Sequence, residues 1–312
     1  MFDLFDTHPE ISQASCDAYA EKILNQPVRP LDWQGCHSYT LESGDEQIVI
    51  QFRSAASPLD KNTVKLAKKV HPTLVPATEY LGFFESTEVT VWKMDKIPGL
   101  GIFYVMDDDD VDIKTKLPAT VTNMAKFYVE AWQSRQTPSL EETLAVRQTC
   151  ETKLAELEEK HSSSSPFLNH IRTCKEALDD ILKLPWVLTH DDLSSMNLLF
   201  NRTTGNLVGV VDWADAEIWP FGKGLWGVES VLGFCGSEGY TWLDDDCLTY
   251  RKLFAASLQE QLCLPADILA IIEKARKLGL LLRYGYEWQD GGFVLVDDTA
   301  VLEMFLDRAM FK

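Results

Sequence analysis

The 312-residue sequence lacks several features that would place it in a common class of protein. Its seven cysteines are scattered without a Cys-x-x-Cys pair, so reduced thiols are expected and a zinc site is not. The apolar run Leu278–Leu282 stops at Arg283 and is far shorter than the roughly 18 residues of a membrane span. The first residues, MFDLFDTHPE, are acidic where a secretory signal would be basic. We therefore expect a cytoplasmic protein that does not bind membranes.

Positive charge is also scarce, since 29 Lys and Arg residues face 48 Asp and Glu residues and the formal net charge is −19. Such a surplus of negative charge argues against nucleic acid or an anionic membrane as the main partner. The nucleotide-binding motif GxxxxGK, the metalloprotease motif HExxH and the hydrolase motif GxSxG are absent from the sequence. A small molecule is the expected partner, although the charge itself is explained better by solubility.

The chain changes character near residue 96. Before that point, apolar patterns of period two predict strands at residues 39–41, 48–52, 80–84 and 89–94. Helical patterns occur at residues 9–26, 60–70, 119–160, 166–183 and 248–312. The strand predicted at residues 89–94 ends where Pro and Gly occur in Lys96–Gly99. We therefore predict an α+β protein, with a small antiparallel-sheet lobe at 1–95, a larger mostly helical lobe at 96–312 and a hinge at about 94–99.

One predicted hairpin interrupts the helical part, and polar residues flank it. Asp192 and Asn197 precede its first strand, and Asp212 follows its second strand, Leu207–Val211. Because a hairpin brings its two ends together, these oxygen-bearing side chains can converge. Oxygen ligands suit Mg²⁺, and a further carboxylate can accept a hydroxyl proton and orient a nucleophile. The acidic run Asp107–Asp110 is expected to be an exposed loop instead.

His190, Asp192 and Asn197 have the spacing of the catalytic loop that kinases use for phosphoryl transfer. In that arrangement Asp192 orients the acceptor hydroxyl, His190 braces the loop, and Asn197 and Asp212 hold the metal ion. Asp, Ser and Asn residues before a strand can also serve only to form a turn, because their side chains bond nearby backbone groups. The Asp212-Trp213 pair after an apolar strand favours the catalytic interpretation.

The segment HDDLSSMNLLFN, followed by GNLVGVVDWADAEIWPFG, resembles the aminoglycoside and choline-kinase-like phosphotransferases. WQGCHSYTL, IVIQFR and MDKIPG are similar to segments of fungal proteins that carry this phosphotransferase domain. The resemblance extends from about residue 28 to about residue 290. It implies a bilobal protein-kinase-like fold and an ATP- and Mg²⁺-dependent transfer of phosphate to a hydroxyl of a small molecule, such as a secondary metabolite.

The resemblance also implies where ATP and the acceptor would bind. The loop Gln34–Ser38 would cover the phosphates, and the hinge would meet the nucleotide. The cofactor-binding residues expected on this basis are Gly35, His37, Ser38, Gln51, Arg53 and Met94. Segments at 111–180, 222–246 and 280–292 would shape the acceptor pocket. Acidic and aromatic residues there suit a cation, but we expect the Trp residues to be core and the acids to be at the surface: Trp242, and Glu229, Glu238 and Asp244–Asp246.

Three positions depart from the family pattern. Asp191 stands where the family usually has Gly, and it adds an anion beside the expected base. The strand Ile48–Arg53 has no Lys for the phosphates, and the following helix has Asn62 where a Glu would pair with that Lys. Arg53 is either a phosphate-binding fork or an exposed charge at a strand end. These departures keep an alternative open, namely a kinase-like fold that binds or transforms a metabolite without phosphoryl transfer.

Overall fold

The computed structural model describes residues 4–102, 112–161, 168–236, 239–244, 247–289 and 292–311. The chain separates into two compact units. Unit 1 consists of Met1–Gly99 and Val208–Asp215, and unit 2 of Leu100–Leu207 and Ala216–Lys312. Unit 1 therefore includes a segment that the sequence analysis assigns to the larger lobe. Within the described ranges, none of the helices has the length and apolarity that a membrane crossing requires.

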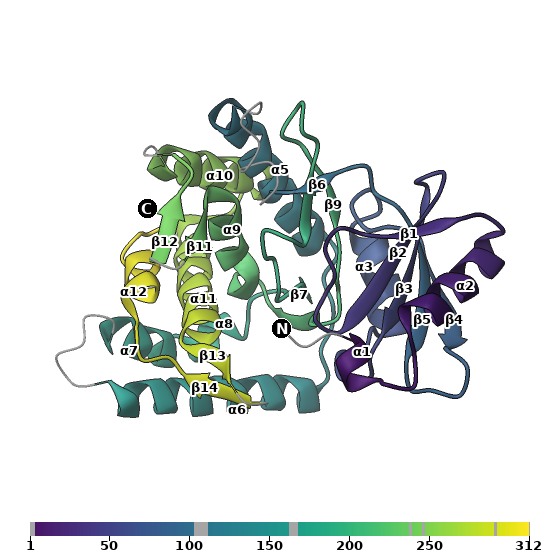
Figure 1. The fold of residues 1–312 in the computed structure, drawn as a ribbon. Coiled ribbons are helices and arrows are strands. Elements are labelled where there is room, and N and C mark those ends of the chain that lie inside the picture. Colours follow the sequence, from purple (N-terminus) through teal and green to yellow (C-terminus); the bar gives the residue numbers. More distant parts are fainter. Residues whose placement is uncertain are drawn as a thin grey trace. The chain divides into compact units, whose positions relative to one another are not determined.

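Unit 1 is built on a five-stranded antiparallel sheet with the order β1-β2-β3-β5-β4 (Figure 1). Its strands are β1 (Val28–Pro30), β2 (Ser38–Ser43), β3 (Ile48–Arg53), β4 (Thr78–Phe83) and β5 (Thr90–Asp95). Its helices are α1 (Leu4–Thr7), α2 (Gln13–Leu24) and α3 (Lys61–Val70). The predicted strands and the two predicted helices of this region are all present, with ends that differ by a few residues.

The two faces of this sheet differ because successive side chains of a strand point to opposite sides. Leu41, Ile50 and Phe52 share one face and form an apolar core with Cys16 and Ala20 of α2. Burial of these side chains removes apolar surface from water and holds α2 against the sheet.

The opposite face carries polar residues and lies toward α3. Thr40 pairs with Gln51, and Gln51 pairs with Trp92 across the neighbouring strands. Tyr80 of β4 is on this face too, and Lys61 of α3 lies 3.5 Å above its ring. The predicted cofactor residues Ser38, Gln51, Arg53 and Met94 all belong to this face.

Unit 2 is mostly helical. Its helices are α5 (Ile113–Gln133), α6 (Leu140–Lys160), α7 (Leu168–Glu176), α8 (Leu178–Ile181), α9 (Glu229–Leu232), α10 (Cys247–Leu262), α11 (Ala266–Tyr284) and α12 (Ala300–Leu306), with the 3₁₀ helix η1 (Lys223–Val228). Short strands pair as β7 (Trp186–Thr189) with β10 (Glu217–Pro220), β6 (Leu100–Gly101) with β8 (Leu198–Phe200), β11 (Gly233–Gly236) with β12 (Gly239–Trp242), and β13 (Tyr286–Gln289) with β14 (Gly292–Leu295). The strand β9 (Leu207–Val210) leads the chain from unit 2 into unit 1.

A charged cluster lies in the core of unit 2. Arg251 Nη2 is 2.8 Å from Glu229 Oε1, and Arg276 Nη2 is 2.7 Å from Glu273 Oε1. Both guanidinium groups also donate to the carbonyl oxygen of Arg308, near the end of the chain. Burial raises the pKa of the Glu229 carboxyl, and the charges of Arg251 and Arg276 oppose that shift. Glu229 is thus a core residue, whereas the sequence predicts a surface position for the acids of this region.

The structure differs from the predicted helices at two places. The helical pattern at 119–160 is divided between α5 and α6, because Pro138 cannot continue a helix. Ser139 then starts α6 with a capping box, in which its side chain and that of Glu142 bond each other's backbone amides. The hairpin of β13 and β14 also interrupts the pattern predicted at 248–312. Asp107–Asp110 lie outside the described residues.

Gly279 of α11 allows this helix to approach η1 closely. A Cβ atom at residue 279 would lie 1.8 Å from the carbonyl oxygen of Lys223. We expect Gly279→Ala to lower the free energy of unfolding by about 1–3 kcal/mol or more, because the backbone must move to make room for the methyl group. Urea denaturation measures this loss. Gly292→Ala is the control, since a Cβ there meets nothing within 4 Å, and equal stability of the two variants would contradict the close approach.

Candidate active site

The loop after β7 brings His190, Asp192 and Asn197 of unit 2 together. The His190 ring is buried, and its Nδ1 accepts a hydrogen bond of 3.3 Å from the Asp192 amide. Asn197 Nδ2 donates to the Asp192 side chain at Oδ2 over 2.8 Å and to its carbonyl oxygen over 2.9 Å. These bonds fix the Asp192 carboxylate, as a catalytic base needs. The Oδ1 atom of Asn197 makes no hydrogen bond within the described part of the chain.

Asp192 has a second partner that spacing in the sequence does not indicate. Arg283 Nη2, at the end of α11, lies 3.3 Å from Asp192 Oδ1. The two residues are far apart in the sequence, so only the course of α11 brings them together.

Asp191 occupies a backbone conformation that explains the family's preference for Gly. Its φ is 61°, in the left-handed region that Gly adopts freely and that Asp tolerates. Its carboxylate forms an ion pair with Lys223 Nζ. Lys223 is buried, and its ammonium lies 4.5 Å from the centre of the Trp219 ring. The added anion is therefore neutralised by a cation that the sequence analysis did not identify.

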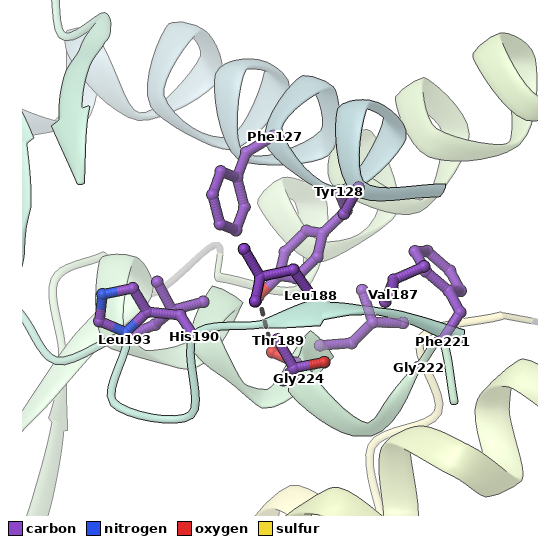
Figure 2. A pocket seen from close by; sticks show the side chains of 12 residues that line it. Phe127, Tyr128, Val187, Leu188, Thr189, His190, Leu193, Phe221, Gly222 and Gly224 are labelled. Carbon is purple, nitrogen blue, oxygen red and sulfur yellow. Dashed lines mark hydrogen bonds between the residues drawn. The ribbon is translucent and has the colours of Figure 1, made fainter. Parts of the chain in front are cut away.

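A small apolar cavity lies beside this loop, lined by residues of α5, β7 and η1 (Figure 2). Its volume of about 10 Å³ admits no more than one water molecule. The Tyr128 hydroxyl donates to the Gly224 carbonyl oxygen over 2.7 Å at this place. Burial raises the pKa of that hydroxyl, which therefore stays protonated as a donor. The cavity is a packing defect in the support of the loop and is too small for an acceptor.

In unit 1, Asp212 is held by the residues around it. Trp213 is buried, donates from Nε1 to the Val210 carbonyl oxygen over 3.0 Å and packs against His71. The Val210 amide donates to the Leu74 carbonyl oxygen over 2.8 Å, which ties this segment to the end of α3. Asp212 itself has a φ of 60°, and its side chain is 42% exposed.

Arg53 is the partner of Asp212. Its Nη2 atom lies 2.9 Å from Asp212 Oδ1 and donates to Ser57 Oγ over 2.8 Å. Its Nε atom donates to the Ser57 carbonyl oxygen, and Nη1 donates to Gln51 Oε1 over 3.3 Å. The side chain is 4% exposed, so the interpretation as an exposed strand-end charge is wrong. Four of its five N–H groups are engaged, so a phosphate could accept from the remaining Nη1 donor, and two parallel bonds would require it to replace Asp212 or Gln51.

The helix α3 provides no acidic partner for Arg53. Asn62 is exposed, and Asp60 instead caps the helix by accepting from the Thr63 amide over 2.7 Å. Arg53 of β3 is thus paired with Asp212 and not with a residue of α3.

The loop of Gln34–Ser38 lies between β1 and β2. The Gln34 side chain accepts from the Thr40 amide over 2.6 Å and donates to the Thr40 carbonyl oxygen over 2.9 Å, and so holds the loop to β2. Gly35 and His37 are exposed, and a Cβ atom at residue 35 would lie 2.8 Å from Ser38 Oγ. Gln34 was not identified as a site residue, and a single Gln carries no signal by which it could have been.

Each unit has a candidate metal-binding side chain with one oxygen atom that is not engaged. Asn197 Oδ1 and Asp212 Oδ2 make no hydrogen bond to any described residue, while the other polar atoms of both side chains are engaged. No cluster of three or more His, Cys, Asp or Glu residues suited to a metal ion occurs among the described residues. Mg²⁺ usually takes only one or two protein oxygens besides water and phosphate, so each of these side chains has the chemistry of a Mg²⁺ ligand.

Comparisons with known proteins identify the family and the fold of the chain. The sequence pattern of the phosphotransferase enzyme family APH matches residues 65–226, just over half of the chain. No protein of curated function matches the sequence.

Solved structures with a similar fold include three phosphotransferases. An aminoglycoside phosphotransferase bound to AMP-PNP and hygromycin B has a TM-score of 0.51 and 13% identity, over 86% of this chain and 90% of that one. A type VIII aminoglycoside-3'-phosphotransferase has a TM-score of 0.51 and 14% identity, over 86% of this chain and 100% of that one. An ethanolamine kinase of Plasmodium vivax has a TM-score of 0.50 and 13% identity, over 84% of this chain and 77% of that one. The predicted protein-kinase-like fold is confirmed.

The Asp191–Lys223 pair can be tested by a double-mutant cycle. We expect Asp191→Asn and Lys223→Met each to reduce stability, the former because a buried ammonium loses its charged partner while Asn, like Asp, tolerates the left-handed backbone. The two losses should be non-additive by about 1–3 kcal/mol, since each variant breaks the same interaction. Thermal or urea unfolding of the four proteins gives this coupling energy. Additive effects would show that the pair contributes nothing of its own.

We expect Arg53→Gln to lower the free energy of unfolding by about 1–3 kcal/mol, because Ser57, Gln51 and Asp212 lose a buried donor. Arg53→Lys should recover only part of this loss, since Lys lacks the planar fork. Urea denaturation of both variants makes the measurement. Arg147→Gln is the matched control, since Arg147 pairs with Asp179 at the surface and should contribute at most about 1 kcal/mol. A loss no larger than in that control would contradict the importance of the Arg53 contacts.

Proposed function

The chain belongs to the phosphotransferase enzyme family APH, and we propose that it transfers the γ-phosphate of ATP to a hydroxyl group of a small molecule. The observation that carries this proposal is the position of Asp192 at the spacing of a kinase catalytic loop. Its carboxylate accepts a hydrogen bond from Asn197, and its backbone amide donates to His190. We further propose that residues 1–95 bind the nucleotide, that residues 96–312 carry the acceptor and the catalytic base, and that residues 94–99 form the hinge.

In the proposed reaction, Asp192 accepts a hydrogen bond from the acceptor hydroxyl. The hydroxyl oxygen forms a bond to the γ-phosphorus, the bond from that phosphorus to the β,γ-bridging oxygen breaks, and ADP leaves with the electron pair. The hydroxyl proton passes to Asp192. Asn197 engages Oδ2 of Asp192 and Arg283 lies 3.3 Å from Oδ1, so the carboxylate is held in a defined orientation, and the acceptor hydroxyl would bind at Oδ1 beside Arg283.

We propose that Asn197 and Asp212 hold Mg²⁺, which when bound would neutralise charge on the phosphate oxygens. Gly35, His37, Ser38, Gln51, Arg53 and Met94 are the proposed nucleotide-binding residues. Four of them share the α3 face of the unit 1 sheet, which supports their assignment to one ligand. Arg53 is proposed to take the place of the strand Lys. The acceptor is proposed to be a metabolite with a free hydroxyl, in keeping with the resemblance to fungal proteins that carry this domain.

A second function is favoured by the Arg53–Asp212 pair. The Arg53 guanidinium already binds one carboxylate oxygen of Asp212, which leaves that carboxylate less available to a metal ion. This contact suits a fold that binds a metabolite without nucleotide. In that case Asp192 would serve as an acid or base in a different reaction, or as a ligand-binding group.

The first test is calorimetric titration of the protein with ATP and MgCl₂. We expect binding that requires the metal and that is lost in Asp212→Ala, because a carboxylate ligand is removed. Circular dichroism of the variant establishes that it is folded. Absence of binding at millimolar nucleotide by a folded wild-type protein would overturn the proposal in favour of the metabolite-binding alternative.

The second test concerns the base. We expect Asp192→Asn to lower kcat for phosphate transfer by about 10²–10⁴-fold while ATP binding is retained, since the amide keeps the shape but cannot take the proton. ADP release in the presence of pooled hydroxyl compounds provides the assay. Ser194→Ala, in the same loop, is the control. Full activity of Asp192→Asn would exclude the role of Asp192 as base.

A further inference from the structure

The two acids of the loop in unit 2 are each paired with a cation. Asp191 pairs with the buried Lys223, and Asp192 pairs with Arg283. The formal charge of these four side chains is therefore zero, although the protein as a whole is strongly acidic. The immediate surroundings of the proposed base are thus less negative than the composition suggests.

Arg283 is placed and held as a binding group. Its guanidinium carbon lies 5.1 Å from the centre of the Trp226 ring, which is itself buried. The Arg283 side chain is 41% exposed, and its bond to Asp192 is the one hydrogen bond that it makes to the described residues. A guanidinium has five N–H donors. Stacking on Trp226 restricts this group while most of its donors remain available to a ligand.

We propose that Arg283 binds an oxyanion, a carboxylate or a phosphate, of the same small molecule whose hydroxyl Asp192 orients. This inference rests on the proposed function and names the class of its acceptor. Guanidinium groups bind carboxylate and phosphate through parallel hydrogen bonds, which gives both energy and orientation. The acceptor is thus a hydroxy acid or a hydroxyalkyl phosphate.

The spacing of the two groups limits the acceptor further. Arg283 Nη2 and Asp192 Oδ1 are 3.3 Å apart, and each would form a hydrogen bond of about 2.7–3.0 Å to the ligand. The hydroxyl and the oxyanion therefore lie close to each other, separated by a few covalent bonds.

A cationic acceptor fits the same residues poorly. An ammonium group could approach Asp191 or Asp192 only by displacing Lys223 or Arg283, which would leave a positive charge without its partner. Other acids are occupied as well, since Glu229 lies in the core with Arg251 and Asp244 is 3.3 Å from Lys114. Glu238, Asp245 and Asp246 lie outside the described residues.

The test measures binding first, so that it does not depend on turnover. Saturation-transfer NMR with wild-type protein would use lactate, glycerate and 3-hydroxybutyrate as hydroxy carboxylates and glycerol 3-phosphate as a hydroxy phosphate. Ethanolamine, choline and kanamycin are the cationic probes. We expect at least one oxyanion probe to bind in preference to the cations, and the two oxyanion groups distinguish a carboxylate from a phosphate.

Variants then assign the binding to Arg283. We expect Arg283→Gln to lower the affinity for the oxyanion probe by about 10- to 100-fold, and Arg283→Glu to abolish its binding. Arg135→Gln is the matched control, because Arg135 stacks on Trp132 at the same distance of 5.1 Å but contacts no loop acid. Thermal unfolding of each variant checks its fold.

The outcomes separate this inference from the proposed function. Failure of all oxyanion probes to bind, or equal binding by Arg283→Gln, overturns the inference. It is also overturned if Arg283→Gln slows transfer to every acceptor equally and leaves binding unchanged, because Arg283 would then act on the phosphoryl group. Oxyanion binding that depends on Arg283, but without any ATP-dependent transfer, supports the inference and counts against the phosphotransferase.

Discussion

The close approach of α11 to η1 is the constraint on which the loop of unit 2 depends. Gly279 lets the helix backbone meet the Lys223 carbonyl oxygen, where a methyl group would not fit. Lys223 begins η1 and pairs with Asp191, while Arg283 ends α11 and pairs with Asp192. One backbone contact thus sets both cations against the two adjacent acids, and the loop receives its electrostatic environment from helices distant in the sequence.

Unit 1 solves a similar electrostatic problem in another way. A buried Arg53 requires a compensating charge, and α3 offers only an exposed Asn62 and the capping Asp60. The compensation comes from Asp212, which the Trp213 and Val210 contacts hold in a left-handed conformation. Loss of the strand Lys and the helix Glu is therefore accompanied by a replacement pair, so that no buried charge remains alone.

Of the acids with positive φ, Asp191 lies next to the proposed base and Asp212 is a candidate metal-binding residue. Backbone in this region costs free energy for residues other than Gly, and it persists where surrounding contacts determine it. Here those contacts are ion pairs with buried cations, Lys223 and Arg53. The same interactions that neutralise the carboxylates also hold their backbone.

The sequence by itself determined the elements and the motif. Local periodicity placed the strands and helices of residues 1–95, and the spacing of His190, Asp192 and Asn197 was enough to identify a loop whose hydrogen bonds are local. The break at Pro138 and the hairpin of β13 and β14 carried weaker signals and were missed. Tertiary structure alone decided the partners of the acids, because Lys223, Arg283 and Arg53 reach them through packing of distant segments. Spacing along a chain reports on neighbours within one loop or helix, whereas the charge around a carboxylate depends on whatever the fold brings beside it.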